Sequence, residues 1–227
     1  KIPNEAIDIN VIGSQNIARV AIENKLDLVI GISTDKASPP VANIYGLTKS
    51  LMERLFCSLN RDKGTRFLCV RFGNIAWSTG SVLPIWKKMA EDKGIIGTTG
   101  PNMYRFFFTV DEAAELVLTA FNNKEELFGK VISREMKAAK LKDILGVWKE
   151  EKGIKIENLP ERPSEREDEF LIGDTELEYS TEVTFNNLKH YILDFSNKSK
   201  SPLKYSLSAK KANKLNKTEI LSLINNP

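Results

Sequence analysis

The stretch Val29–Phe56 (VIGISTDKASPPVANIYGLTKSLMERLF) contains an apolar run, a polar turn and an amphipathic segment. The apolar run Leu28–Ile32 is typical of a strand buried on both faces of a parallel sheet. Leucines recur every four residues at Leu47, Leu51 and Leu55, which predicts a helix with one apolar face, and Met52 and Phe56 widen that face. A strand, a turn and a helix in this order favour an α/β fold with its ligand site at the carboxyl end of the strand.

Tyr45 and Lys49 are four residues apart, so both side chains leave the predicted helix on one face. The pKa of a phenol is about 10, but a nearby ammonium stabilises the phenolate and lowers that pKa. Tyr45 then becomes a candidate base for a substrate hydroxyl. An exposed Tyr/Lys pair that merely covers a helix surface is the alternative interpretation.

The polar turn contains Ser33, Thr34, Asp35 and Lys36 in succession. These residues supply hydroxyls, a carboxylate and an amine at the point where open α/β sheets bind their ligands. A catalytic role competes here with a simpler one, in which Asp35 and Lys36 only cap the strand end.

The ordered set Ser-Thr-Asp-Lys-Ala, a Pro-Pro loop and Tyr-Gly-x-x-Lys resembles the extended short-chain dehydrogenase/reductase superfamily. Within it, the motifs are similar to those of the polysaccharide-biosynthesis nucleotide-sugar 4,6-dehydratases and epimerases. This resemblance implies a Rossmann-like doubly wound parallel sheet, of which the chain holds the C-terminal part, and a small α+β substrate-binding subdomain. It also implies NADP or NAD as cofactor and a UDP-sugar as substrate.

The resemblance divides the chain into three parts: 1–100 as part of the catalytic domain, 101–173 as a substrate-binding segment whose strands return to the core, and 174–227 as a C-terminal extension. Periodicity predicts helices over 4–24 (with Asn4 as N-cap), 83–93, 141–152 and 218–224, a turn-rich link over 94–101, and a hairpin over 174–195. Residues 196–217 are expected to be rich in loops.

Further residues match the family's cofactor-binding motifs. Asn10 stands where the family has an active-site asparagine, although a helix-interior asparagine that bonds locally is the alternative. Phe72 ends the predicted strand 66–72. The resemblance therefore implies that Asn10, Ser33, Tyr45, Lys49 and Phe72 contact the cofactor.

The loop after that strand resembles a family segment that approaches the nicotinamide and the sugar nucleotide. Asn74, Ser81 and Val82 match the segment, whereas Thr79 replaces an arginine and Trp77 replaces a small residue. These departures suggest a reshaped pocket. An ordinary Gly/Ser loop is the alternative.

Three charged residues resemble the family's contacts to the sugar diphosphate: Arg105, Arg162 and Glu165. A planar guanidinium suits a diphosphate because it donates two parallel hydrogen bonds. The alternatives are a surface guanidinium beside aromatic residues for Arg105 and a solvated charge run for the other two.

Composition narrows the possible classes of function. The chain has 227 residues, 41% of them hydrophobic, and 33 basic against 30 acidic side chains, which gives no nucleic-acid footprint. Apolar runs are too short to cross a membrane, so we expect a cytoplasmic protein without a membrane partner.

Cys57 and Cys69 are interpreted as reduced core residues. His190 is the only histidine, which excludes a multi-histidine metal site; a hairpin-packing or solvent-facing role is favoured over catalysis.

No G-x-G-x-x-G motif occurs in the sequence. In the family the dinucleotide-binding half precedes the helix 4–24, so we expect the chain to be part of a longer protein. Without that half, the strand at 27–33 should form an uncovered sheet edge, apolar helix faces should be exposed, and a homo-oligomer is expected.

The motifs leave three functional hypotheses. The first is a UDP-N-acetylhexosamine 4,6-dehydratase, in which Tyr45 and Lys49 serve transient C4 oxidation, Lys36 takes the C5 proton, Asp35 protonates the departing 6-hydroxyl, and Thr34 or Ser33 bonds the C4 oxygen. The second is a UDP-sugar 4-epimerase, which needs no relay through Asp35 and Lys36. The third is a non-catalytic nucleotide-sugar-binding module.

Overall fold

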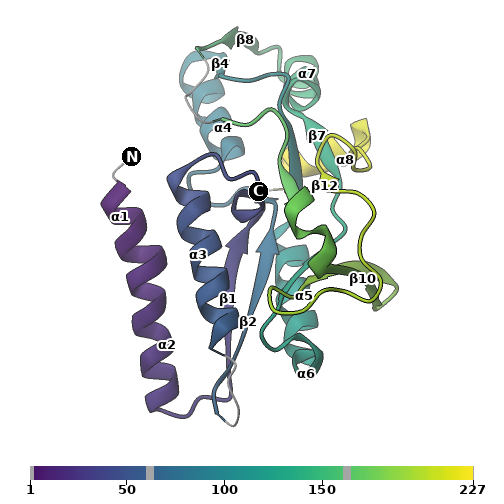
Figure 1. Ribbon diagram of the computed structural model, residues 1–227. Helices are drawn as coiled ribbons and strands as arrows, with labels where there is room; N and C mark the ends of the chain where they lie inside the picture. Colours follow the sequence, from purple (N-terminus) through teal and green to yellow (C-terminus); the bar gives the residue numbers. More distant parts are fainter. Residues whose placement is uncertain (1–2, 60–63, 161–164, 227) are drawn as a thin grey trace. The chain divides into compact units, whose positions relative to one another are not determined.

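The computed structural model describes residues 3–59, 64–160 and 165–226, which fall into two compact units (Figure 1). Unit 1 contains Lys1–Phe72, Ala114–Glu135 and Phe170–Leu207, and unit 2 contains Gly73–Ala113, Met136–Glu169 and Ser208–Pro227. The division predicted from sequence followed chain order. Each unit instead combines three separate stretches, because strands that pair within one unit come from distant parts of the sequence.

The helices and strands are, in chain order, α1 (Pro3–Ile7), η1 (Asp8–Gly13), α2 (Ser14–Glu23), β1 (Leu28–Thr34), η2 (Asp35–Ala37), α3 (Ile44–Ser58), β2 (Arg66–Phe72), β3 (Asn74–Ile75), α4 (Val82–Lys93), β4 (Ile95–Thr98), β5 (Tyr104–Phe108), α5 (Val110–Asn122), α6 (Lys124–Leu127), β6 (Val131–Arg134), β7 (Ala138–Lys140), α7 (Leu141–Lys152), β8 (Lys155–Asn158), β9 (Phe170–Ile172), η3 (Asp174–Tyr179), β10 (Ser180–Phe185), β11 (Leu188–Leu193), β12 (Leu207–Ser208) and α8 (Lys217–Asn225). None of the helices in the described ranges is long and apolar enough to cross a membrane.

Unit 1 is built on a five-stranded sheet with the order β1-β2-β6-β11-β10. Strands β1, β2 and β6 are parallel, and the hairpin β10–β11 is added in antiparallel orientation. Helix α3 packs on β1 and β2, with α2 beside it (Figure 1). This arrangement confirms the predicted Rossmann-like α/β class. It also places the hairpin, predicted to lie in a C-terminal extension, within the main sheet.

The N-terminal helical run differs in detail from the prediction. It starts at Pro3, so Asn4 lies within the first turn and is not the N-cap. Its middle, η1, has π-helical hydrogen bonding, a geometry that is often found at functional sites. Ile9 is 63% exposed and Ile17 is 59% exposed, as expected for an apolar face that nothing in the described chain covers.

Helix α3 buries one part of its predicted apolar face and exposes the other. Met52 and Phe56 are buried against the sheet, but Leu47 and Leu51 are each about half exposed. Strand β1 lies at one edge of its sheet in the described residues. The sheet edge at β1 and the exposed apolar residues of α2 and α3 agree with the prediction made for a chain without the dinucleotide-binding half. The expected homo-oligomer stays a prediction.

Unit 2 has a separate core and two small sheets, β3-β5-β7 and the parallel pair β4-β8. Trp86 and Trp148 meet edge to face at the centre of this core, with ring centroids 6.2 Å apart. Helix α8 adds Ile220 and Leu223, so the end of the predicted extension packs into this core. Residues 94–101, predicted as a link, contain β4.

Candidate active site

The polar turn and the start of α3 approach each other closely in unit 1. The side chain of Asn43 caps α3 by accepting a hydrogen bond from the backbone N–H of Gly46 at 2.9 Å. A Cβ atom at position 46 would collide with the carbonyl oxygen of Lys36. Only glycine therefore permits this approach, which brings the neighbouring Tyr45 against the turn.

The Tyr45 phenol interacts with the turn rather than with solvent alone. Desolvation raises the pKa of Tyr45, and the Asp35 carboxylate raises it further. The Lys36 ammonium and a side-chain hydrogen bond with Thr34 lower that pKa. The raising effects are larger, so the pKa of Tyr45 lies above its usual value and the predicted lowering is wrong for this chain without ligands.

Lys49, the predicted partner of Tyr45, is bound to the backbone of β1. Its ammonium donates a hydrogen bond to the carbonyl oxygen of Ile32 at 2.9 Å. Desolvation lowers the pKa of Lys49, although Cys69 and Glu53 oppose that shift. Lys36 is a second cation near the phenol, and its charge lowers the pKa of Tyr45.

The turn forms a compact hydrogen-bonded group around Asp35, whose side chain is fully buried. Asp35 Oδ1 accepts from the Thr34 hydroxyl at 2.9 Å and from Lys36 Nζ at 3.1 Å. Two buried oxygens, Ser33 Oγ and Asp35 Oδ2, have no hydrogen-bond partner within the described chain. Buried polar atoms are nearly always paired in proteins, so these two oxygens mark a place for a ligand or water.

Asn10 and Phe72 also lie near this group. Asn10 Nδ2 donates to the Thr48 hydroxyl at 3.0 Å, and that hydroxyl donates to the carbonyl oxygen of Tyr45 at 3.0 Å. Phe72 is buried and pairs with Thr34 in the register of β1 and β2. The structure therefore brings together all the unit 1 residues predicted for catalysis and cofactor binding.

Unit 2 contains a cavity of about 410 Å³, within the range of small-molecule sites. Its walls include five of the residues predicted to bind substrate: Asn74, Ser81, Val82, Arg105 and Glu165. The sixth, Arg162, lies outside the described residues. Residues separated by up to 91 positions in sequence thus line one cavity.

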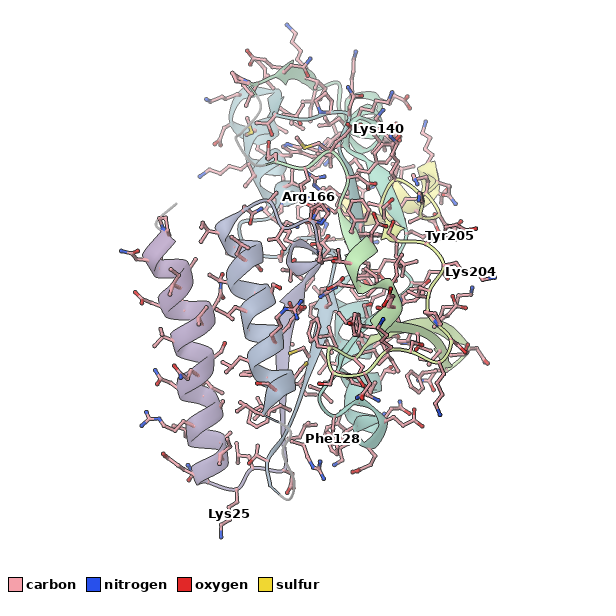
Figure 2. All side chains as sticks on the ribbon, in the orientation of Figure 1. Lys25, Phe128, Lys140, Arg166, Lys204 and Tyr205 are labelled. Atoms are coloured by element: carbon pink, nitrogen blue, oxygen red, sulfur yellow. The ribbon has the colours of Figure 1, made fainter. Side chains whose placement is uncertain are left out.

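Polar groups at this cavity are held by specific contacts. Asn74 Nδ2 donates to the carbonyl oxygen of Phe106 at 2.9 Å. Arg105 Nη1 donates to the carbonyl oxygen of Tyr104 at 2.8 Å, and its Nε lies 3.9 Å from Glu169 Oε1. Arg166 (Figure 2) also reaches Glu169, at 3.6 Å. The two charged residues of the cavity wall, Arg105 and Glu165, have opposite signs, so the net charge of the wall by itself does not favour an anionic ligand.

The sequence missed part of the cavity wall and misjudged one residue. Thr98 and Thr99 line the cavity, but they fall in the segment predicted as a link. Trp77 was expected to reshape the pocket. Its indole instead donates to the carbonyl oxygen of Leu223 at 2.7 Å and packs 6.5 Å from the Trp148 ring.

The described residues contain no cluster of three or more His, Cys, Asp or Glu side chains suited to a metal ion.

A parallel α/β sheet whose first strand ends in Ser-Thr-Asp-Lys, followed by a Tyr-x-x-x-Lys helix, defines the extended short-chain dehydrogenase/reductase class. Residues 1–190 match the family model described as polysaccharide biosynthesis protein, and the chain belongs to this family of nucleotide-sugar epimerase and dehydratase type.

Three similar proteins illustrate the relationship. The chain is 39% identical over 187 residues to the uncharacterized membrane protein MJ1061 of Methanocaldococcus jannaschii, covering 77% of this chain and 55% of that protein. It is 36% identical over 183 residues to a UDP-glucose 4-epimerase of Rickettsia rickettsii, covering 77% and 52% respectively. The solved structure of Pen from Bacillus thuringiensis superposes with a TM-score of 0.88 at 30% identity, covering 99% and 69%. The chain spans about half the length of these two curated relatives.

Proposed function

We propose that the protein is an NAD(P)-dependent nucleotide-sugar 4,6-dehydratase that acts on a UDP-N-acetylhexosamine. The supporting observation is the grouping of Tyr45, Asp35 and Lys36 at one turn. A phenol base is sufficient for transient oxidation at C4. Dehydration also needs a base for the C5 proton and an acid for the 6-hydroxyl, and this turn has candidates for both roles.

The residues around the turn fit the nicotinamide end of a cofactor. Ser33 Oγ and Asp35 Oδ2 are buried polar atoms with no partner in the described chain, and Lys49 lies beside the same strand end. Asn10 and Phe72 complete the proposed cofactor set. NAD or NADP bound here would accept a hydride from the sugar C4 and return it to the product.

In this mechanism Tyr45 removes the proton from the 4-hydroxyl, and Ser33 or Thr34 donates a hydrogen bond to that oxygen. The ketone formed at C4 makes the C5 hydrogen acidic. Lys36 then takes the C5 proton while Asp35 gives a proton to the departing 6-hydroxyl, which leaves as water. The electron pair of the C5–H bond forms the C5=C6 double bond as the C6–O bond breaks. The hydride that was taken from C4 would return to C6, and Lys36 would return a proton to C5, which leaves the 4-ketone.

The mechanism requires a neutral Lys36 as base and a protonated Asp35 as acid. Lys36 Nζ lies 3.1 Å from Asp35 Oδ1, so these two forms differ from the ion pair by transfer of one proton between adjacent atoms. The transfer gives a neutral amine as base and a carboxylic acid as acid. Proton uptake from C5 and proton delivery to the 6-hydroxyl then restore the ion pair.

The cavity of unit 2 is the proposed substrate-recognition site. Arg105 and Arg162 would bind the diphosphate, and Glu165 would orient it or the ribose. Asn74, Ser81 and Val82 would contact the sugar nucleotide. The apolar remainder of the wall, which includes Leu83 and Trp86, suits a ring stacked away from water.

A 4-epimerase is the second candidate, because a relative 36% identical to the chain is a UDP-glucose 4-epimerase. Mass spectrometry of a UDP-N-acetylhexosamine incubated with the protein and NAD or NADP separates the two. Loss of one water supports the dehydratase, and unchanged mass with inverted C4 stereochemistry supports the epimerase.

Asp35→Asn is the variant that tests the assignment. It should abolish water loss by a dehydratase but spare an epimerase. Asp27→Asn, an exposed aspartate just before β1, is the matched control and should leave water loss intact. If NADPH fluorescence titration shows no cofactor binding and no sugar nucleotide is converted, the non-catalytic module replaces both enzymes.

A further inference from the structure

Arg71, near the end of β2, is fully buried and forms two ion pairs inside unit 1. Its Nε and Nη2 donate to the two carboxylate oxygens of Glu53, at 2.9 and 2.6 Å. Its Nη1 and Nη2 donate to Glu176 at 3.0 Å each, and Nη1 also donates to the carbonyl oxygen of Leu171 at 2.8 Å. All the guanidinium nitrogens are therefore engaged in this charge cluster of Glu53, Arg71 and Glu176.

The Arg71–Glu53 ion pair of the charge cluster involves α3, the helix that carries the proposed base Tyr45. Glu53 lies four residues after Lys49 and eight after Tyr45 on α3, so the three side chains share one face of the helix. Both Glu53 oxygens are bound by Arg71. The bidentate pair therefore fixes α3 against β2.

Glu176, the second carboxylate of the charge cluster, is joined to the polar turn through Ser38. Ser38 is the C-cap residue of η2 (Asp35–Ala37). The Ser38 hydroxyl donates to Glu176 Oε2 at 3.1 Å, and the backbone N–H of Gly173 donates to the same oxygen at 3.1 Å. A Cβ atom at Gly173 would collide with the carbonyl oxygen of Pro39. The loop before Glu176 is thus packed directly on the turn.

Burying such a cluster costs desolvation free energy. Two carboxylates and one guanidinium lie within hydrogen-bond distance in a region that excludes water, and the two carboxylates raise the pKa of Arg71 well above its usual value. Buried ion pairs are often no more stabilising than apolar residues of similar volume, and a role in fixing a particular geometry is one explanation for their presence.

We propose that Arg71 is a positioning residue that aligns the Asp35–Lys36 turn with Tyr45, and that Ser38 is the link to the turn. The benefit to catalysis rests on the proposed function. The alignment itself depends only on the contacts within unit 1.

Ser38→Ala tests the link. It removes one hydroxyl but leaves Arg71 paired with both glutamates, so the thermal unfolding midpoint should change little. The turn should loosen and change the effects of Lys36, Asp35 and Thr34 on the phenol, which should shift the pKa of Tyr45. NMR titration of ring-labelled tyrosine in the 227-residue chain measures this pKa, with Tyr45→Phe used to assign the resonance.

Kinetics supply the second readout. In the active protein Ser38→Ala should lower kcat about tenfold with KM changed less than about twofold, because positioning acts on the reaction and not on binding. Ser38→Cys, which keeps a weak donor, should fall between the two proteins. Ser133→Ala is the matched control, since this serine is also buried in the sheet but bonds Tyr191 instead of the charge cluster.

The two parts of the proposal fail in distinguishable ways. If Ser38→Ala and Ser38→Cys leave both the Tyr45 titration and kcat unchanged, the positioning role is overturned. A wild-type protein with no turnover would refute the proposed function, but a shifted Tyr45 titration in Ser38→Ala would still support the alignment.

Discussion

The polar turn of unit 1 and the cavity of unit 2 both contain charged side chains, but these side chains differ in their burial and in their surroundings. In unit 1 Arg71 and Asp35 are fully buried, and the nitrogens of Arg71 and one oxygen of Asp35 are bound to other protein atoms. In unit 2 Arg105 lines a cavity of mostly apolar character. The comparison indicates that unit 1 fixes the geometry of reacting groups, whereas unit 2 offers a surface that selects a ligand.

The largest expected effect comes from breaking the buried charge of unit 1. Arg71→Leu leaves Glu53 and Glu176 buried without their cation, and should destabilise the fold by about 3–5 kcal/mol. Urea unfolding monitored by circular dichroism measures this change. Lys217→Leu is the control because the Lys217–Glu150 pair is solvent exposed, and its midpoint should not move. Equal midpoints for the two variants would remove the contrast between buried and surface charge.

Next in size is the loss of the proposed base. Tyr45→Phe should lower kcat by about 10²–10⁴-fold, the usual contribution of general acid–base catalysis, with little change in stability. Steady-state assays of sugar-nucleotide conversion provide the measurement. A variant with wild-type kcat would show that Tyr45 is only a surface residue of α3.

A smaller effect is expected in the unit 2 cavity. Arg105→Lys keeps the positive charge but loses the planar fork, so KM for the UDP-sugar should rise about tenfold while kcat changes less. Lys88→Arg, at an exposed position of α4 that is absent from this cavity wall, is the control. An effect confined to kcat would place Arg105 in the reaction and contradict the division of roles between the units.

The smallest expected effect concerns His190, which is buried in the β10–β11 hairpin and packs edge-on against Phe185. Desolvation lowers the pKa of His190, the charge of Arg134 adds to this, and a hydrogen bond with the carbonyl oxygen of Leu188 opposes it. The unfolded chain therefore binds this proton more readily. Stability should be fully present above about pH 6.5 and should decline as the pH falls below it.

Comparing urea midpoints of the wild type and His190→Gln between pH 7.5 and pH 5 isolates this contribution from that of the carboxylates. The variant should lose less stability on acidification. Parallel curves for the two proteins would mean that His190 does not titrate differently on folding.

Local sequence patterns predicted much of the fold. The apolar run before Ser33 and the helix after Asn43 appear, because hydrophobic periodicity is readable over a few residues. The predicted hairpin is present over 180–193, whereas residues 174–179 form η3. Which part of the apolar face of α3 meets the sheet was not predictable in this way, because it depends on neighbours elsewhere in the chain.

The candidate site shows the same limit. Family motifs predicted its residues, and the structure places those that it describes in two groups, one in each unit. The charges around Tyr45 depend on distances that spacing alone does not give, so the influence of Lys36 on the phenol was not predicted. Arg71 binds Glu53 and Glu176, which are 18 and 105 positions away in sequence, so a local pattern could not predict the charge cluster.

The most direct test of the account follows a deuterium atom placed at C4 of a UDP-N-acetylhexosamine. Product analysis by NMR and mass spectrometry then locates the label. If Tyr45, Lys36 and Asp35 act together as proposed, the product has lost one water and carries the deuterium at C6. A product of unchanged mass with the deuterium still at C4 would contradict the proposed dehydratase.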